Sequence, residues 1–213
     1  MTTLLFVRHG QSRANIEKRF AGALNSPLTE LGRTQAAATA RYIAEHYTVD
    51  AVYASDLDRA FYTGKAVAEL TGTPLTPDRN LREIAAGDWE GIPFDDLATR
   101  FADSYQIWLH NIGEATCDGG ESVAQLQARV VACIRRIVAE HPNQTVVIAT
   151  HATPIRTFQC FCEGRPLAQM KTIPWVSNAS VTAVRFENGE FSLAEVDQHD
   201  HLGALASLLP ANV

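Results

Sequence analysis

Residues 4–12 read LLFVRHGQS, a stretch in which charged and small residues follow an apolar run without a break. The apolar part, residues 4–7, is typical of a strand that is buried on both faces of a sheet. It ends at Arg8, His9 and Gly10. Ligands of open parallel sheets bind at the carboxyl ends of the strands, so this tripeptide indicates a site at the edge of a sheet. The alternative at this point is that Arg8 and His9 only mark where the chain leaves the core.

Apolar runs and helical periodicity alternate along the rest of the chain. In residues 122–141 apolar residues recur at intervals of three and four, and Ser122 with Gln125 makes a capping-box pattern. The patterns predict strands at 4–7, 51–54, 145–150, 180–187 and 190–196, and helices at about 30–46, 57–70, 122–141 and 153–164. Asn188-Gly189 separates the last two strands and predicts a type I′ hairpin. We therefore expect an α/β fold, a three-layer α/β/α sandwich with a mostly parallel central sheet and a C-terminal β-hairpin.

The connecting segments are less regular. Thr29 is expected to cap the helix that follows it, and Ser55 with Asp56 is expected to cap the helix over 57–70. Residues 80–91 predict irregular or edge structure. Residues 92–121 predict short helices, which either cover a site or form a peripheral packing layer.

Composition restricts the class of protein. The chain has 213 residues, 46% of them hydrophobic, which suits one domain with a sizeable core. Its formal charge is −6, which argues against nucleic acid or a membrane surface as the main partner. No secretory signal or membrane-spanning run is recognised, and the four cysteines have no metal-type spacing, so we expect a cytoplasmic protein. The oligomeric state is not predicted.

A second strand repeats the pattern of the first, because residues 145–150 run directly into His151. Arg59 lies in the first turn of the helix over 57–70, where a helix N-terminus already favours anions. If Arg8, Arg59 and the two imidazoles converge, the group fits a phosphoryl group, since guanidinium forks match phosphate oxygens. The alternative for Arg59 is a surface ion pair with Asp56, which would contribute little.

Phosphoryl transfer needs charge stabilisation, an in-line nucleophile and a proton for the leaving oxygen. A histidine is the nucleophile when its attacking nitrogen is unprotonated, and neighbouring arginines disfavour the imidazolium. A carboxyl group can supply the proton, and Glu83 is the candidate. The alternative for Glu83 is a salt bridge to Arg82 or to another surface cation.

These residues belong to motifs that resemble the histidine phosphatase superfamily, the group that contains cofactor-dependent phosphoglycerate mutase and related phosphatases. The motifs follow one another over nearly the whole chain: RHGQS with Asn15, Gly22, PLTELGRTQA at 27–36, SDLDRAFYTGKAVA at 55–68, LREIAAGDWEG at 81–91, GGES at 119–122 and VVIATHATPIR at 146–156.

The resemblance implies a role for each matching residue. His9 would become phosphohistidine, and Glu83 would act first as acid and then as base for water. The phosphoryl oxygens would be held by Arg8, Arg59 and His151, with Asn15, Gly22 and the backbone N–H of Ala152 at the same pocket. The resemblance also implies one domain over 1–213, a variable segment over 88–121 that covers the substrate, and no metal or other cofactor. The run His199-Asp200-His201 lacks a suitably spaced third partner for a metal.

Two departures and several alternatives stay open. Ala152 stands where the family commonly has glycine, and Ala85-Ala86 replaces bulkier or charged residues.

The mutases of the family are longer after the acidic residue, so this chain is more similar to the phosphatases and is expected to hydrolyse a small-molecule phosphate monoester. A mutase and a phospho-ligand-binding protein without catalysis remain alternatives, and a Ser/His/Asp hydrolase lacks its G-x-S-x-G motif. The substrate is open. The aromatic residues Trp89, Phe94, Trp108 and Trp175 are either walls of the pocket or ordinary core residues. The cations Arg82, Arg156 and Lys171 either contact a second anionic group or are surface charges.

Overall fold

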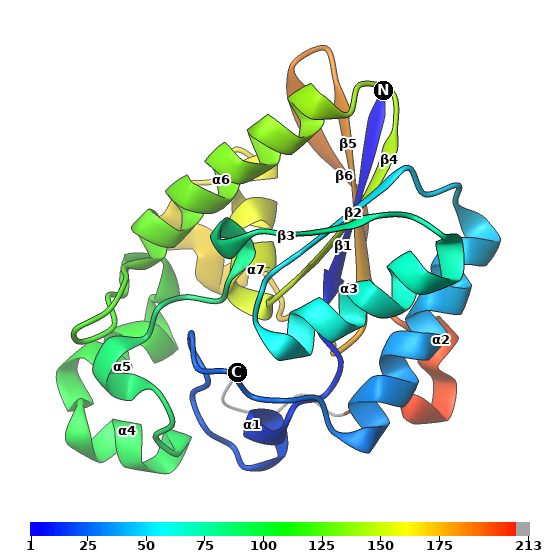
Figure 1. Ribbon diagram of the computed structural model, residues 1–213. Helices are drawn as coiled ribbons and strands as arrows, with labels where there is room; N and C mark the ends of the chain where they lie inside the picture. Colours follow the sequence, from blue (N-terminus) through cyan, green and yellow to red (C-terminus); the bar gives the residue numbers. More distant parts are fainter. Residues whose placement is uncertain (208–213) are drawn as a thin grey trace.

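The computed structural model describes residues 1–207, and its centre is a six-stranded sheet (Figure 1). The order of the strands is β3-β2-β4-β1-β5-β6, and the first four are parallel, whereas β5 runs antiparallel to β1 and to β6. The strands are β1 (Thr2–Arg8), β2 (Ala51–Ala54), β3 (Leu75–Pro77), β4 (Thr145–Thr150), β5 (Val181–Glu187) and β6 (Glu190–Gln198). The predicted mostly parallel sheet with a terminal hairpin is confirmed.

Helices cover both faces of this sheet. The α-helices are α1 (Arg13–Ile16), α2 (Glu30–His46), α3 (Asp58–Thr71), α4 (Phe94–Arg100), α5 (Ala102–His110), α6 (Val123–Glu140) and α7 (Ala152–Cys162). Figure 1 shows α2 and α3 on one side of the strands and α6 and α7 on the other, with α4 and α5 beyond the end of α6. The three layers expected from the alternation of strands and helices are therefore present.

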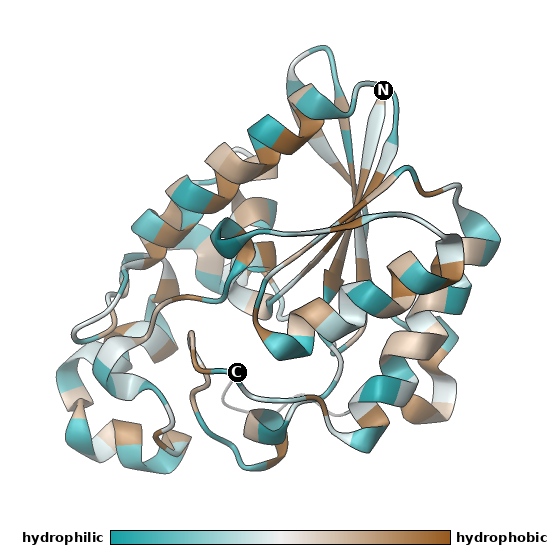
Figure 2. Ribbon diagram, in the orientation of Figure 1, coloured by the Kyte–Doolittle hydropathy of each residue, from teal (hydrophilic) through white to brown (hydrophobic). Residues whose placement is uncertain are grey.

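Alternate residues of β1 belong to opposite sides of the core, as the twofold periodicity of a strand requires. Leu5 and Val7 pack in the cluster that contains residues of α2 and α3, whereas Leu4 and Phe6 pack with residues of α6 and α7. All four are buried, which is why the run is apolar without interruption. Figure 2 shows the same division on α6, where hydrophobic and hydrophilic surfaces lie along opposite sides of the helix.

Two of the predicted helix caps and the predicted hairpin turn are present in the structure. The Thr29 hydroxyl accepts from the backbone N–H of Gly32 at 3.0 Å and caps α2. Ser122 and Gln125 form the capping box that begins α6. Asn188 and Gly189 have φ values of 53° and 86°, the left-handed conformation that a type I′ turn requires.

Three features of the fold differ from the sequence prediction. β3 is an edge strand of three residues, too short for the alternation by which strands are recognised. Ser55 and Asp56 do not form the N-cap of α3, which falls at Leu57. The helix expected from Thr153 begins one residue earlier, with His151 as its N-cap. Among residues 1–207, no helix is long and apolar enough to cross a membrane.

Candidate active site

The carboxyl ends of β1 and β4 lie next to each other, and this brings the two histidines together. Arg8 pairs with Thr150 in the parallel register, and the His9 backbone N–H donates to the Thr150 carbonyl at 3.0 Å. The ring centroids of His9 and His151 are 5.2 Å apart, with an interplanar angle of 61°. The two buried strands therefore deliver one imidazole each to the same point.

His9 is held in a single tautomer. Its Nδ1 lies 2.7 Å from the Gly10 carbonyl oxygen, which can only accept, so Nδ1 carries the proton and Nε2 is the unprotonated nitrogen. Burial lowers the pKa of His9 well below its ordinary value, and the charges of Arg59 and Arg8 lower it further. The ring is therefore neutral at physiological pH, with a nitrogen lone pair available.

Gly10 is needed at this turn because of its neighbour in α2. A Cβ at Gly10 would lie 2.3 Å from the backbone oxygen of Gly32. The Gly10 N–H also donates to the Thr63 hydroxyl of α3 at 3.1 Å. The close approach fixes the loop after β1 against two helices and thereby fixes His9.

Arg8 and Arg59 are buried cations that bond to carbonyl groups rather than to carboxylates. Arg8 donates to the Val176 carbonyl, and its Nε is buried without a hydrogen-bond partner among residues 1–207. Arg59 donates to the carbonyls of Gly22 and Leu24, both at 2.8 Å. Burial lowers the pKa of each guanidinium to about 10, so both stay charged at neutral pH. Since buried charges are costly without a counter-ion, the two arginines favour an anion in this place.

The alternative of an Arg59–Asp56 surface pair is wrong. Arg59 is 1% exposed, and Asp56 instead pairs with Arg82 at 2.5 Å. That pair also excludes the alternative of a Glu83–Arg82 salt bridge. Arg82, expected to bind substrate, does not line the cavity that contains His9, because both its Nε and its Nη2 donate to the Asp56 carboxylate.

His151 lies edge-on to the His9 ring and is fully buried, so it does not line the cavity in which it was expected to hold phosphoryl oxygens. Its Nε2 is 2.9 Å from the Ser55 hydroxyl, while its Nδ1 is buried without a partner among residues 1–207. Burial, followed by the charge of Arg59, lowers the pKa of His151 well below its ordinary value. Of the other expected pocket residues, Asn15, Gly22 and Ala152 line the cavity in front of His9.

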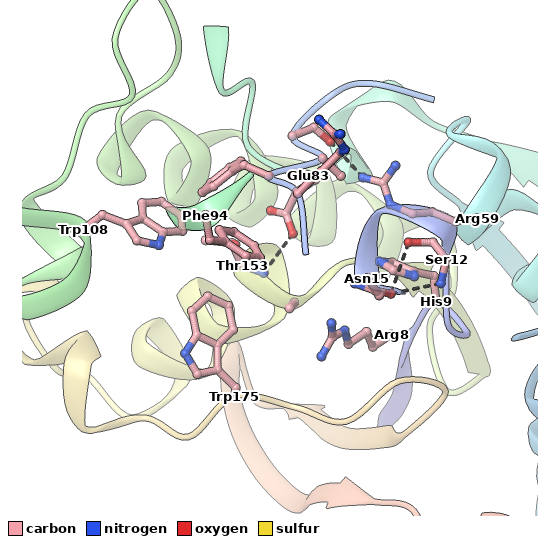
Figure 3. A pocket seen from close by; sticks show the side chains of 15 residues that line it. Arg8, His9, Ser12, Asn15, Arg59, Glu83, Phe94, Trp108, Thr153 and Trp175 are labelled. Atoms are coloured by element: carbon pink, nitrogen blue, oxygen red, sulfur yellow. Dashed lines mark hydrogen bonds between the residues drawn. The ribbon is translucent and has the colours of Figure 1, made fainter. Parts of the chain in front are cut away.

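Glu83 enters the cavity from the loop after β3. Its carboxyl oxygens accept from the backbone N–H groups of Ile84 at 2.8 Å and Thr153 at 3.3 Å. Figure 3 shows this carboxyl group between the aromatic side chains on one side and Arg8, His9 and Arg59 on the other. The position is suited to proton exchange with a group bound between them.

Arg129 of α6 holds the backbone of this loop, a role that the sequence did not indicate. Its guanidinium donates to the carbonyls of Asn80, Arg82 and Glu83 at 2.8–2.9 Å. It also pairs with Glu121 at 2.7 Å. Arg129 therefore positions Glu83 through the main chain.

Ser55, Thr153 and Asn178 are further site residues absent from the sequence prediction. Asn178 donates to the His9 carbonyl at 3.1 Å and to the Asn15 side-chain oxygen at 3.3 Å. Ser55 follows β2 directly, so the signal that identified His9 and His151 could have found it as well.

Polar and charged residues line the cavity around His9, and aromatic residues line its other end (Figure 3). Phe94, Trp108 and Trp175 line it, as expected, together with Phe20. Trp89 does not, because it is fully buried behind Phe20. Arg156 is buried beneath Trp175, and Lys171 is exposed outside the cavity.

Within residues 1–207 no cluster of three or more histidine, cysteine, aspartate or glutamate side chains is arranged to hold a metal ion. The two histidines of the run 199–201 form hydrogen bonds within the protein. His199 Nδ1 lies 2.6 Å from the Asp197 carbonyl, and His201 Nε2 lies 2.9 Å from the Thr39 hydroxyl.

The lowered pKa values of His9 and His151 predict how stability depends on pH. The folded state keeps both rings neutral below the ordinary value of 6.5, whereas the unfolded chain takes up protons there. Stability is therefore full above pH 6.5 and falls below it, by up to about 1.4 kcal/mol per pH unit for each histidine. Urea unfolding between pH 7 and 5 in phosphate-free buffer measures this slope. His151→Asn is expected to make the slope shallower by one such contribution, and an unchanged slope would contradict the assignment.

Comparison with known proteins identifies the family. A family model described as the histidine phosphatase superfamily (branch 1) matches residues 4–199, so the chain belongs to this superfamily. Phosphoserine phosphatase 1 of Hydrogenobacter thermophilus is 28% identical over 203 residues, which cover 95% of each chain. Glucosyl-3-phosphoglycerate phosphatase of Mycobacterium tuberculosis is 30% identical over 187 residues, 84% of this chain and 83% of the relative.

Solved structures agree with this assignment. YhfR of Bacillus stearothermophilus superimposes with a TM-score of 0.90 at 30% identity, over 95% of this chain and all of the other. The mycobacterial glucosyl-3-phosphoglycerate phosphatase in complex with VO3 gives a TM-score of 0.85 at 29% identity, over 92% and 99% of the two chains. The phosphatases among these relatives support a hydrolase that acts on phosphate esters.

Proposed function

We propose that this protein hydrolyses small-molecule phosphate monoesters through a phosphohistidine on His9. The observation that supports it best is the unprotonated Nε2 of His9 beside two buried guanidiniums that have no carboxylate partner. A phosphate dianion supplies the missing negative charge and presents a phosphorus atom to the nucleophile.

The first step transfers the phosphoryl group to the protein. His9 Nε2 forms a bond to phosphorus while the bond from phosphorus to the ester oxygen breaks, and protonated Glu83 gives its proton to the leaving oxygen. Arg8 and Arg59, with the N–H groups at the start of α7, stabilise the charge on the other oxygens, and the buried ring of His151 packs against that of His9.

The second step returns the protein to its initial state. The Glu83 carboxylate takes a proton from a water molecule, whose oxygen attacks phosphorus as the bond to His9 breaks. Inorganic phosphate leaves, and Glu83 is again protonated. Because the guanidiniums supply the positive charge, this proposal requires no metal or other cofactor.

In this proposal the chain is one histidine phosphatase domain over 1–213, of which residues 208–213 lie outside the described part. The segment 88–121 covers the substrate, which is supported by Phe94 of α4 and Trp108 of α5 at the cavity. Asn15, Gly22 and Ala152 face the phosphoryl group.

Phosphate release from p-nitrophenyl phosphate, with and without EDTA and vanadate, tests the proposal. We expect turnover that EDTA leaves unchanged and vanadate inhibits. Absence of turnover at any pH would contradict hydrolysis, and loss of turnover with EDTA would contradict the metal-independent mechanism. Conversion of 3-phosphoglycerate to 2-phosphoglycerate without phosphate release would favour a mutase instead.

A further inference from the structure

Trp175 forms a fixed aromatic surface in the cavity. Its indole ring is backed by the guanidinium of Arg156, whose central carbon lies 3.9 Å from the ring centroid. Arg156 is 3% exposed, and it donates to the carbonyl of Ile173 at 2.7 and 3.0 Å and to that of Met170 at 3.2 Å. A buried cation that stacks on one side of an indole holds the ring in place. The partly exposed remainder of Trp175 lines the cavity.

The rest of this end of the cavity is also aromatic. Phe20, Phe94 and Trp108 line it, and Phe20 contacts the other two edge-to-face at centroid distances of 6.0 and 5.0 Å. Figure 3 shows Phe94, Trp108 and Trp175 away from His9 and Arg59, on the far side of Glu83. A substrate whose phosphoryl group lies at His9 therefore extends its other end among aromatic rings.

Among the described residues that line the cavity, no cation at this end is without a partner of its own. Besides Arg8 and Arg59, the cavity-lining residue with a positive charge is Arg19. Its guanidinium donates to the Gly91 carbonyl at 2.7 Å and pairs with Glu17 at 3.4 Å. Arg82 is paired with Asp56, and Arg156 is covered by Trp175. A substrate carboxylate here would have to compete with Glu17 and the Gly91 carbonyl for Arg19.

We propose that the preferred substrates are phosphate monoesters whose leaving group is a planar aromatic alcohol without a second anionic group, stacked on Trp175. This inference rests on the proposed function and adds the substrate class to it. Aromatic pairs in offset or edge-to-face geometry bind more tightly than their buried area alone predicts, by about three- to tenfold.

Benzyl phosphate and cyclohexylmethyl phosphate are the probes that test stacking. Their alcohols are similar in size and acidity, so the chemical step is matched, and only the first has a planar ring. We expect kcat/KM to favour benzyl phosphate by about three- to tenfold in the parent protein. Trp175→Leu is expected to abolish this preference, and Trp175→Phe to retain part of it. Tyr62→Leu, which alters an exposed aromatic residue outside the cavity, is the control and is expected to keep the full preference.

O-phosphoserine and 3-phosphoglycerate test the absence of a second anion site, and both are expected to be poorer substrates than benzyl phosphate. Equal kcat/KM for the planar and non-planar esters, an equal loss on both in Trp175→Leu, or a preference for either carboxylate substrate would overturn this inference while leaving hydrolysis intact. Failure to release phosphate from every ester would overturn the proposed function itself.

Discussion

His9→Ala is expected to lose turnover by about 10⁴-fold or more, because no other group at the site replaces the attacking nitrogen. Alanine removes the imidazole together with its bond to the Gly10 carbonyl, but it keeps the main-chain carbonyl of residue 9, to which the Asn178 side chain donates. Initial rates of phosphate release from benzyl phosphate measure the loss.

Covalent labelling identifies the atom responsible. Parent protein mixed with ³²P-labelled substrate and quenched in alkali is expected to retain one label that acid removes, which is the behaviour of phosphohistidine. His9→Ala is expected to carry none. His110→Ala, an exposed histidine at the end of α5, is the control and should be labelled like the parent. A His9→Ala protein that releases phosphate at the parent rate would refute the mechanism.

The convergence of His9, His151, Arg8 and Arg59 could be predicted because each residue is tied to the end of a regular element. An apolar strand fixes where its last residue lies, and parallel neighbours end at the same edge of the sheet. By the same rule Ser55 could have been predicted as a site residue, because it follows β2 as His9 follows β1. Its helix-capping pattern led instead to the prediction that it caps α3. Its hydroxyl lies at His151 instead.

The partners of charged residues could not be predicted, since they depend on elements distant in the chain. Arg82 precedes Glu83 in the sequence, yet it pairs with Asp56, and the arginine that holds the Glu83 backbone is Arg129 of α6. Arg156 was a candidate contact for a second anionic group or a surface charge, and instead it is buried beneath Trp175. Charge alone identifies neither the partner nor the burial of a side chain, because both follow from tertiary packing.

Glu83→Gln is expected to lower kcat for benzyl phosphate by about 10²–10⁴-fold, the usual contribution of a general acid to breaking a bond to a poor leaving group. The amide keeps the shape of the side chain and an oxygen that can accept from Ile84, but it cannot deliver a proton. The loss in the first step is expected to be much smaller for p-nitrophenyl phosphate, because p-nitrophenolate leaves without being protonated.

In the Glu83→Gln variant, transfer of the phosphoryl group to His9 can therefore be measured apart from hydrolysis of the phosphohistidine. Glu83→Gln mixed with p-nitrophenyl phosphate is expected to release a burst of one p-nitrophenolate per protein and then to stall as phosphohistidine, because water lacks its base. Glu69→Gln, which alters an exposed carboxyl group paired with Lys65, is the control and should show steady turnover without a burst. If Glu83→Gln slowed both esters equally and accumulated no phosphoenzyme, Glu83 would act on binding or folding rather than on proton transfer. The leaving-group dependence thus distinguishes an acid–base residue from a structural carboxylate at the same position.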